Sequence, residues 1–157
     1  INLIVTRFHP TTNQFQIVAI KHNNISAWTI PEEIIDDGEN ISTTIKHKFI
    51  EEADNISDSI NKNKLDEIVS NLFANGKIIY NGYVDNPHNT DNSWIETKVY
   101  HLHCSTEFER ILPLKNEYDN IMVIWLNVDN SDIRYKNLHT SHKHLIDNII
   151  NQIRFSN

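Results

Sequence analysis

Residues 30–53 decide the fold, and they read IPEEIIDDGENISTTIKHKFIEEA. The first half is acidic and turn-forming. Asn40 is a suitable N-cap, and after it apolar residues recur at a helical spacing, at Ile41, Ile45, Phe49 and Ala53. Positions 48, 51 and 52 lie three and four apart, so Lys48, Glu51 and Glu52 share one face of the predicted helix. The stretch therefore predicts a loop that leads into a helix with an acidic flank.

Outward from this stretch, strand and helix patterns alternate along the chain. β-Branched and aromatic runs predict strands at 2–8, 15–21, 77–84, 94–104 and 121–128. Amphipathic spacing predicts further helices at 57–75, which ends at the C-cap position of Gly76, and at 141–155. Strands interleaved with helices indicate an α/β fold, a mixed β-sheet sandwiched between α-helices.

Composition restricts the class of protein. A length of 157 residues with 39% hydrophobic content suits a single domain, 1–157. No apolar run is long enough to predict membrane insertion, and a formal charge of -7 argues against nucleic-acid binding. A single cysteine, Cys104, fits a reducing compartment and a cytoplasmic location, and it is expected to be a small apolar strand residue.

Two other features allow a structural and a functional interpretation. Trp94 is expected to anchor the core rather than to touch a ligand. His101 and His103 lie on one face of a predicted strand and could suggest zinc, but the sequence shows no third ligand nearby, which favours exposed strand histidines.

Residues 30–53 resemble the Nudix box, in which Gly, five residues, Glu and seven residues precede Arg-Glu-apolar-x-Glu-Glu. Glu39 takes the early Glu, Phe49 the apolar place, and Glu51 and Glu52 the closing pair, without a gap. Carboxylates on one rigid helix can hold the hard cation that diphosphate hydrolysis requires. The resemblance thus implies a Nudix fold, Glu51 and Glu52 as catalytic residues, and a metal site at Glu39, Glu51 and Glu52.

The departures from the box bear on catalysis. Glu32 and Glu33 replace the two opening glycines, and His47-Lys48 replaces Arg-Glu. The Lys48 ammonium occupies the place of a metal-binding carboxylate and competes with the cation. We therefore expect weak or absent Mg²⁺ binding and impaired turnover, although Glu33 could supply a replacement ligand.

Residues 82–97, GYVDNPHNTDNSWIET, form a second signature. The run is similar to GYxDDPRNTDNAWxET of mitochondrial-type ADP-ribose pyrophosphatases and of the homologous cytosolic domain of ADP-ribose-gated melastatin-type TRP cation channels. The segment 138–146, LHTSHKHLI, looks like the LYASH or LYANH segment of that family. The likeness spans the Nudix core only, and we expect the family's N-terminal cap subdomain to be absent.

Carried over position by position, the resemblance implies a ligand site for ADP-ribose. Its members are Trp28, Asp85, Asn86, His88, His139, Ser141 and His142. His88 replaces an arginine that can fork onto phosphate oxygens, and His139 replaces a tyrosine that stacks on adenine, so both contacts are expected to weaken.

Three functional hypotheses follow. The favoured one is a degenerate Nudix domain that senses ADP-ribose within a TRP-type calcium-permeable channel subunit, on the cytosolic face of the membrane. The second is a Mg²⁺-dependent pyrophosphatase that hydrolyses ADP-ribose to AMP and ribose 5-phosphate. The third is a structural assembly module that has lost the ligand, which the replacements at His88 and His139 leave open.

Overall fold

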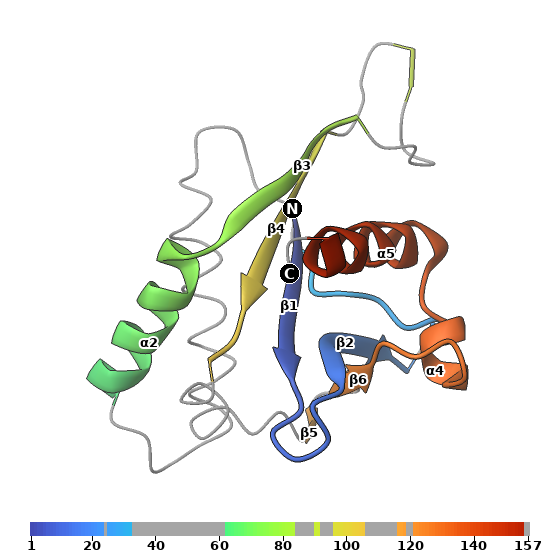
Figure 1. The fold of residues 1–157 in the computed structure, drawn as a ribbon. Coiled ribbons are helices and arrows are strands. Elements are labelled where there is room, and N and C mark those ends of the chain that lie inside the picture. Colours follow the sequence, from blue (N-terminus) through green and yellow to red (C-terminus); the bar gives the residue numbers. More distant parts are fainter. Residues whose placement is uncertain are drawn as a thin grey trace.

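The computed structural model describes residues 1–23, 25–32, 62–83, 90–91, 96–105, 116–118 and 121–155. The predicted helix within 30–53 and most of the predicted loop at 82–97 lie outside these residues. The described part consists of one sheet and three helices (Figure 1).

The sheet has six strands in the order β3-β4-β1-β2-β6-β5. The strands are β1 (Asn2–Phe8), β2 (Phe15–His22), β3 (Lys77–Tyr83), β4 (Glu96–His103), β5 (Asn116–Tyr118) and β6 (Ile121–Asn127). β1 and β4 are parallel, with Asn2 opposite Val99 and Thr6 opposite His103. The other four pairs are antiparallel, so the sheet is mixed as predicted.

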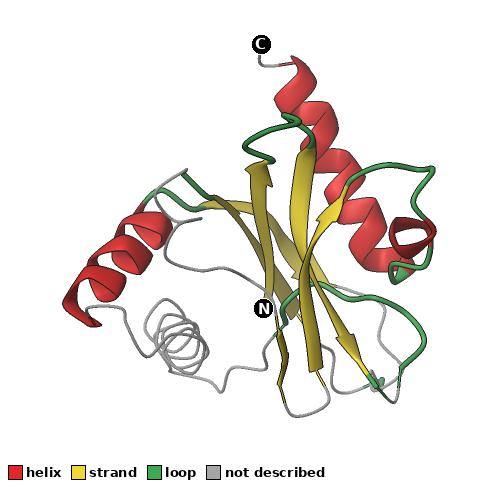
Figure 2. Cartoon of the chain, turned by 90° about the horizontal axis from the view of Figure 1, so that it is seen from below, coloured by secondary structure: helices red, strands yellow, loops and turns green. Residues whose placement is uncertain are grey.

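Side chains of the strands alternate between two hydrophobic clusters, one on each face of the sheet. Leu3 and Val5 pack with α2 (Lys62–Ala74) through its buried Val69 and Leu72. Ile4, from the same strand, belongs to the cluster of α5 (Thr140–Phe155), which includes Ile146 and Ile149. Figure 2 shows α2 and α5 on opposite sides of the sheet, which confirms the predicted sandwich.

The predicted strands at 2–8, 15–21, 77–84, 94–104 and 121–128 all have a counterpart in the structure, with bounds shifted by two residues or fewer. The predicted helix at 57–75 is described over 62–74, and the predicted helix at 141–155 begins one residue earlier. Two short elements were not predicted: β5, and α4 (Ile133–Lys136).

Gly76 lies at the predicted position after α2, separated from it by Asn75, but its φ lies outside the left-handed range that a C-cap glycine usually adopts. A Cβ at this position would lie 2.5 Å from Cδ2 of Leu102 and 3.1 Å from the carbonyl oxygen of Phe73. Glycine is therefore required by the close approach of β4, whose Leu102 is fully buried.

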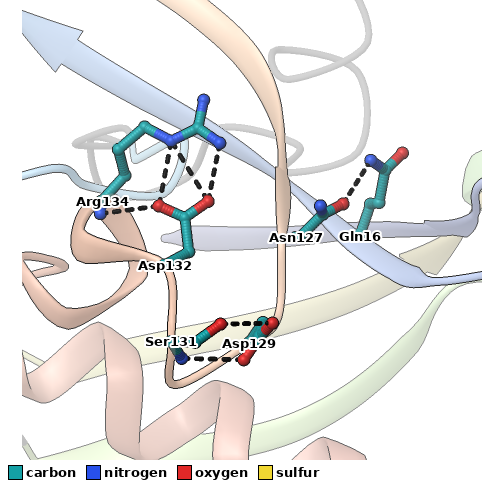
Figure 3. A network of polar contacts seen from close by, with 6 residues as sticks. All are labelled: Gln16, Asn127, Asp129, Ser131, Asp132 and Arg134. Atoms are coloured by element: carbon teal, nitrogen blue, oxygen red, sulfur yellow. Dashed lines mark hydrogen bonds and ion pairs between the residues drawn. The ribbon is translucent and has the colours of Figure 1, made fainter.

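α4 begins at a network of side-chain caps that the sequence patterns did not indicate (Figure 3). The backbone N–H of Arg134 donates to Oδ1 of Asp132 at 2.8 Å, and the Arg134 guanidinium contacts the same carboxylate at 2.6 Å. Just before it, the Ser131 backbone N–H and hydroxyl each donate to Asp129 at 2.7 Å. These contacts fix the turn that carries the chain from β6 to residues 137–142.

Candidate functional site

Residues 28–32 form an extended segment that crosses between strands and helices. Isolated bridges join Ile20 to Thr29 and Asn2 to Glu32, and the Leu3 N–H donates to the Pro31 carbonyl at 2.8 Å. The segment is thereby fixed to both β2 and β1. These contacts fix the position at which the Nudix-like stretch, residues 30–53, begins.

The other side of this segment contacts the connection between α4 and α5. The Trp28 N–H donates to the Asn137 carbonyl at 3.0 Å, and the His139 N–H donates to the Trp28 carbonyl at 2.8 Å. The Trp28 side chain is only 6% exposed and lies in the cluster with Tyr135 and Leu138. The structure thus places Trp28 next to His139 mainly as a core residue, covered on one ring face by the Lys21 ammonium 5.7 Å from the ring centroid.

His142 joins the two segments through its side chain. Nδ1 accepts a hydrogen bond from the Ile30 backbone N–H at 3.4 Å. The proton of the neutral ring is therefore assigned to Nε2. Nε2 lies 3.7 Å from the Glu32 carboxylate. Burial, and next the neighbouring His139, lower the pKa of His142 to about 4. The ring is neutral near pH 7, so its approach to Glu32 is not an ion pair at that pH.

His139 is the exposed aromatic side chain of this region. Its ring centroid lies 5.2 Å from that of His142, and its Nδ1 is 2.8 Å from the Ser141 hydroxyl. Ser141 thereby fixes the orientation of the ring, and the buried His142 supports it from one side. An exposed, oriented imidazole beside a hydroxyl can stack on a flat heteroaromatic ring.

The structure therefore brings together four of the predicted ligand-site residues: Trp28, His139, Ser141 and His142. Lys21 and Glu32 border them and were not predicted as members of the site. The sequence did single out Glu32, because it stands where the resemblance expects glycine. Lys21 ends the predicted strand at 15–21, and nothing in the sequence marked it as a site residue.

The remaining predicted residues, Asp85, Asn86, His88, Glu39, Glu51 and Glu52, lie outside the described residues, as do Glu33, Lys48 and Trp94. The residues proposed for Mg²⁺ are all carboxylates, the oxygen donors that this ion takes in proteins. Within the described ranges, no group of three or more His, Cys, Asp or Glu could hold a metal ion. Nor does any helix there have the length and apolar character needed to cross a membrane.

Similarity to known proteins adds to this geometry, although no family model matches the chain. The chain is 38% identical over 132 residues to a putative Nudix hydrolase 6 of Caenorhabditis elegans, covering 84% of the chain and 47% of that relative. It is 37% identical over 144 residues to the mitochondrial ADP-ribose pyrophosphatase of Rattus norvegicus, covering 88% of the chain and 40% of the relative. The chain thus spans less than half of the length of these curated relatives.

A partial match extends to channels. The chain is 36% identical over 90 residues to a transient receptor potential cation channel subfamily M member-like 2 of Nematostella vectensis, which covers 56% of the chain and 6% of the channel.

Solved structures agree on the fold. A mutT/nudix family protein from Listeria innocua superposes with a TM-score of 0.59 at 14% identity, covering 99% of this chain and 92% of that one. The NUDIX domain of Shewanella oneidensis NrtR, solved with ADP ribose, gives a TM-score of 0.59 at 15% identity, covering 97% and 85%. The chain has the Nudix fold, and its relatives in sequence support a place in the Nudix and ADP-ribose pyrophosphatase family.

Proposed function

We propose that the chain binds ADP-ribose through the surface formed by residues 28–32 and 138–142, and hydrolyses it slowly with Mg²⁺ to AMP and ribose 5-phosphate. The observation that carries the proposal is the contact of His142 with Ile30 and its approach to Glu32. These segments are 112 residues apart in sequence, and the resemblance assigns both to one nucleotide site. The exposed His139 ring is the proposed partner of the adenine.

Hydrolysis, rather than sensing alone, is supported by the two relatives that match most of the chain, since their names are those of a hydrolase and a pyrophosphatase. These matches favour the pyrophosphatase over the ligand-sensing channel domain. Mg²⁺ would be held by Glu39, Glu51 and Glu52 and would neutralise charge on the diphosphate. Lys48 beside them is the reason to expect slow turnover.

The second candidate is a ligand-sensing domain of a TRP-type channel. It is supported by Lys48 in place of a metal-binding Glu and by the partial match to a channel. In this case ADP-ribose binds and is released unchanged, and the rest of a channel subunit is the partner. Asp85, Asn86 and His88 would face the diphosphate and ribose in both candidates.

Calorimetric titration with ADP-ribose, followed by chromatography of the products in the presence of Mg²⁺, separates the candidates. Saturable binding with AMP formation supports the pyrophosphatase, and binding without AMP supports the sensor. His139→Ala is expected to weaken binding about threefold to tenfold through the lost stacking, whereas His144→Ala, at an exposed residue of the following helix α5, should leave it unchanged. A folded parent chain that binds nothing would overturn both candidates and leave the assembly module.

A further inference from the structure

Thr6, His101 and His103 form a second polar cluster, near the carboxyl ends of β1 and β4. These two strands run parallel and side by side (Figure 1). Thr6 is fully buried, His101 is partly buried and His103 is exposed. All three side chains lie on the sheet face that carries Ile4 and Val99, because alternate residues of a strand share a face. The cluster is therefore built by the register of two strands and opens to solvent at His103.

Two imidazole nitrogens converge on one hydroxyl. Nε2 of His101 lies 2.8 Å from Oγ1 of Thr6, and Nδ1 of His103 lies 2.9 Å from the same oxygen. A third contact, from this hydroxyl to the Leu102 carbonyl, is longer at 3.4 Å. A hydroxyl has one hydrogen to donate, so at most one imidazole receives it and the other ring must donate its own.

The same distances match those between the ligands of a transition metal. For bonds of about 2.0–2.1 Å that meet at right angles, neighbouring ligand atoms lie about 2.9 Å apart. His101 and His103 are alternate residues of β4, so their rings stand side by side on one face of the strand, with centroids 6.4 Å apart. Their nitrogens both lie beside the Thr6 hydroxyl, where one ion could contact both rings.

The donor set also restricts the ion. Two imidazoles and a hydroxyl are unsuited to Mg²⁺ or Ca²⁺, which prefer carboxylates and carbonyls. Two imidazole nitrogens with an oxygen suit Cu²⁺ and Ni²⁺, which take such ligands in square-planar or tetragonal sites. Water can complete the coordination from the exposed side of His103.

We propose that His101 and His103, assisted by the Thr6 hydroxyl, form a binding site for Cu²⁺ or Ni²⁺ that is separate from the nucleotide surface. The sequence pattern shows no third ligand near these two histidines. Thr6 supplies that ligand, because the parallel pairing of β1 with β4 brings it opposite His103. The site does not depend on whether the chain binds ADP-ribose.

The test is a titration of the whole chain with Cu²⁺ in the presence of excess Mg²⁺, which keeps carboxylate sites occupied. We expect saturable binding and an electron paramagnetic resonance spectrum of the Cu²⁺ ion with coupling to two imidazole nitrogens. His101→Asn and His103→Asn should each weaken binding at least about tenfold and remove one nitrogen from the coupling pattern. His144→Asn, the same substitution at an exposed histidine of α5, should change neither the affinity nor the spectrum.

Thr6→Val keeps the shape of the side chain and removes the hydroxyl, so it is expected to weaken Cu²⁺ binding while both nitrogen couplings remain. If either histidine variant fails to fold, the ring nitrogens of His101 and His103 can be followed in the parent chain by ¹⁵N nuclear magnetic resonance. Bound Ni²⁺ should broaden the signals of both rings. Unchanged Cu²⁺ affinity in folded His101→Asn and His103→Asn chains, or no broadening of these rings, would overturn the proposal.

Discussion

Nδ1 of His142 accepts a hydrogen bond from the backbone N–H of Ile30, which ties the start of α5 to the segment that enters the Nudix-like stretch. The bond requires a lone pair on Nδ1, and a second proton would occupy that lone pair. Protonation of His142 therefore breaks the contact and places a charge in a buried position. The two segments of the proposed nucleotide surface are held together by a side chain that must stay neutral.

The first prediction concerns the pH dependence of stability at His142. Its pKa is about 4 in the folded chain, lowered first by burial and then by His139, against a usual value of 6.5. Between pH 4 and 6.5 the unfolded chain holds the extra proton and the folded chain does not, so the free energy of unfolding falls as the pH is lowered through this range. Over the whole window the loss due to His142 is roughly 1–3 kcal/mol.

Urea denaturation at pH 7.5 and pH 4.5 measures this effect. In His142→Gln the fall in unfolding free energy between the two pH values should be smaller than in the parent chain, because the group that must be deprotonated is gone. His144→Gln serves as the control, since this exposed histidine lies on the same helix. An equal fall in His142→Gln and the parent would contradict the assignment of a buried neutral ring.

The second prediction compares two glycines. Gly76→Ala introduces a Cβ that would lie 2.5 Å from the fully buried Leu102, and we expect it to lower the free energy of unfolding by about 1–3 kcal/mol through overpacking. Gly82→Ala meets only ordinary contacts, the nearest being 3.4 Å from the Tyr80 hydroxyl. Chemical denaturation should therefore separate the two variants, and equal stability would show that Leu102 moves aside without cost.

The third prediction concerns Trp28, which the resemblance places in the ligand site and which the structure places in the core. Because the side chain is 6% exposed and lies among Tyr135 and Leu138, Trp28→Ala should cost about 3–5 kcal/mol of stability. Trp28→Phe should retain most of that stability and bind ADP-ribose nearly as well as the parent chain. Ile133→Ala, at a side chain that is 65% exposed, is the control and should change stability little. A large loss of ADP-ribose affinity in a stable Trp28→Phe chain would make the indole a direct ligand contact.

The fold was predictable from the sequence wherever a local pattern determines the element. β1 and β2 have seven and eight residues and are rich in apolar and β-branched side chains, so residue type alone predicts both strands. β5 has three residues and exists only because Asn116 to Tyr118 pair with β6, and α4 depends on the carboxylate of Asp132. Neither gives a periodic signal in the sequence.

The candidate site was predictable only through resemblance. The burial of His142 depends on Ile30, and the cluster at Thr6 depends on the register with His103. Both are contacts between distant segments, and no spacing within one segment encodes them. Histidines on a strand are more often exposed, which is why the sequence pattern favoured that interpretation for His101 and His103; His103 is exposed, whereas His101 is half-buried.

The last prediction tests the consequence of Lys48 for turnover. If Glu51 and Glu52 hold Mg²⁺ as the resemblance implies, the ammonium at position 48 both repels the ion and displaces a ligand. Lys48→Glu should remove this repulsion and restore the missing carboxylate ligand. We expect it to raise the rate of AMP formation from ADP-ribose at least about tenfold and to lower the Mg²⁺ concentration that gives half-maximal activity. Lys48→Gln removes the cation without adding a carboxylate, so its gain should be smaller. The Lys48→Glu chain could still bind ADP-ribose yet hydrolyse it no faster than buffer alone does. That result would mean that catalysis lacks further residues besides a carboxylate at position 48, and it would favour the ligand-sensing domain.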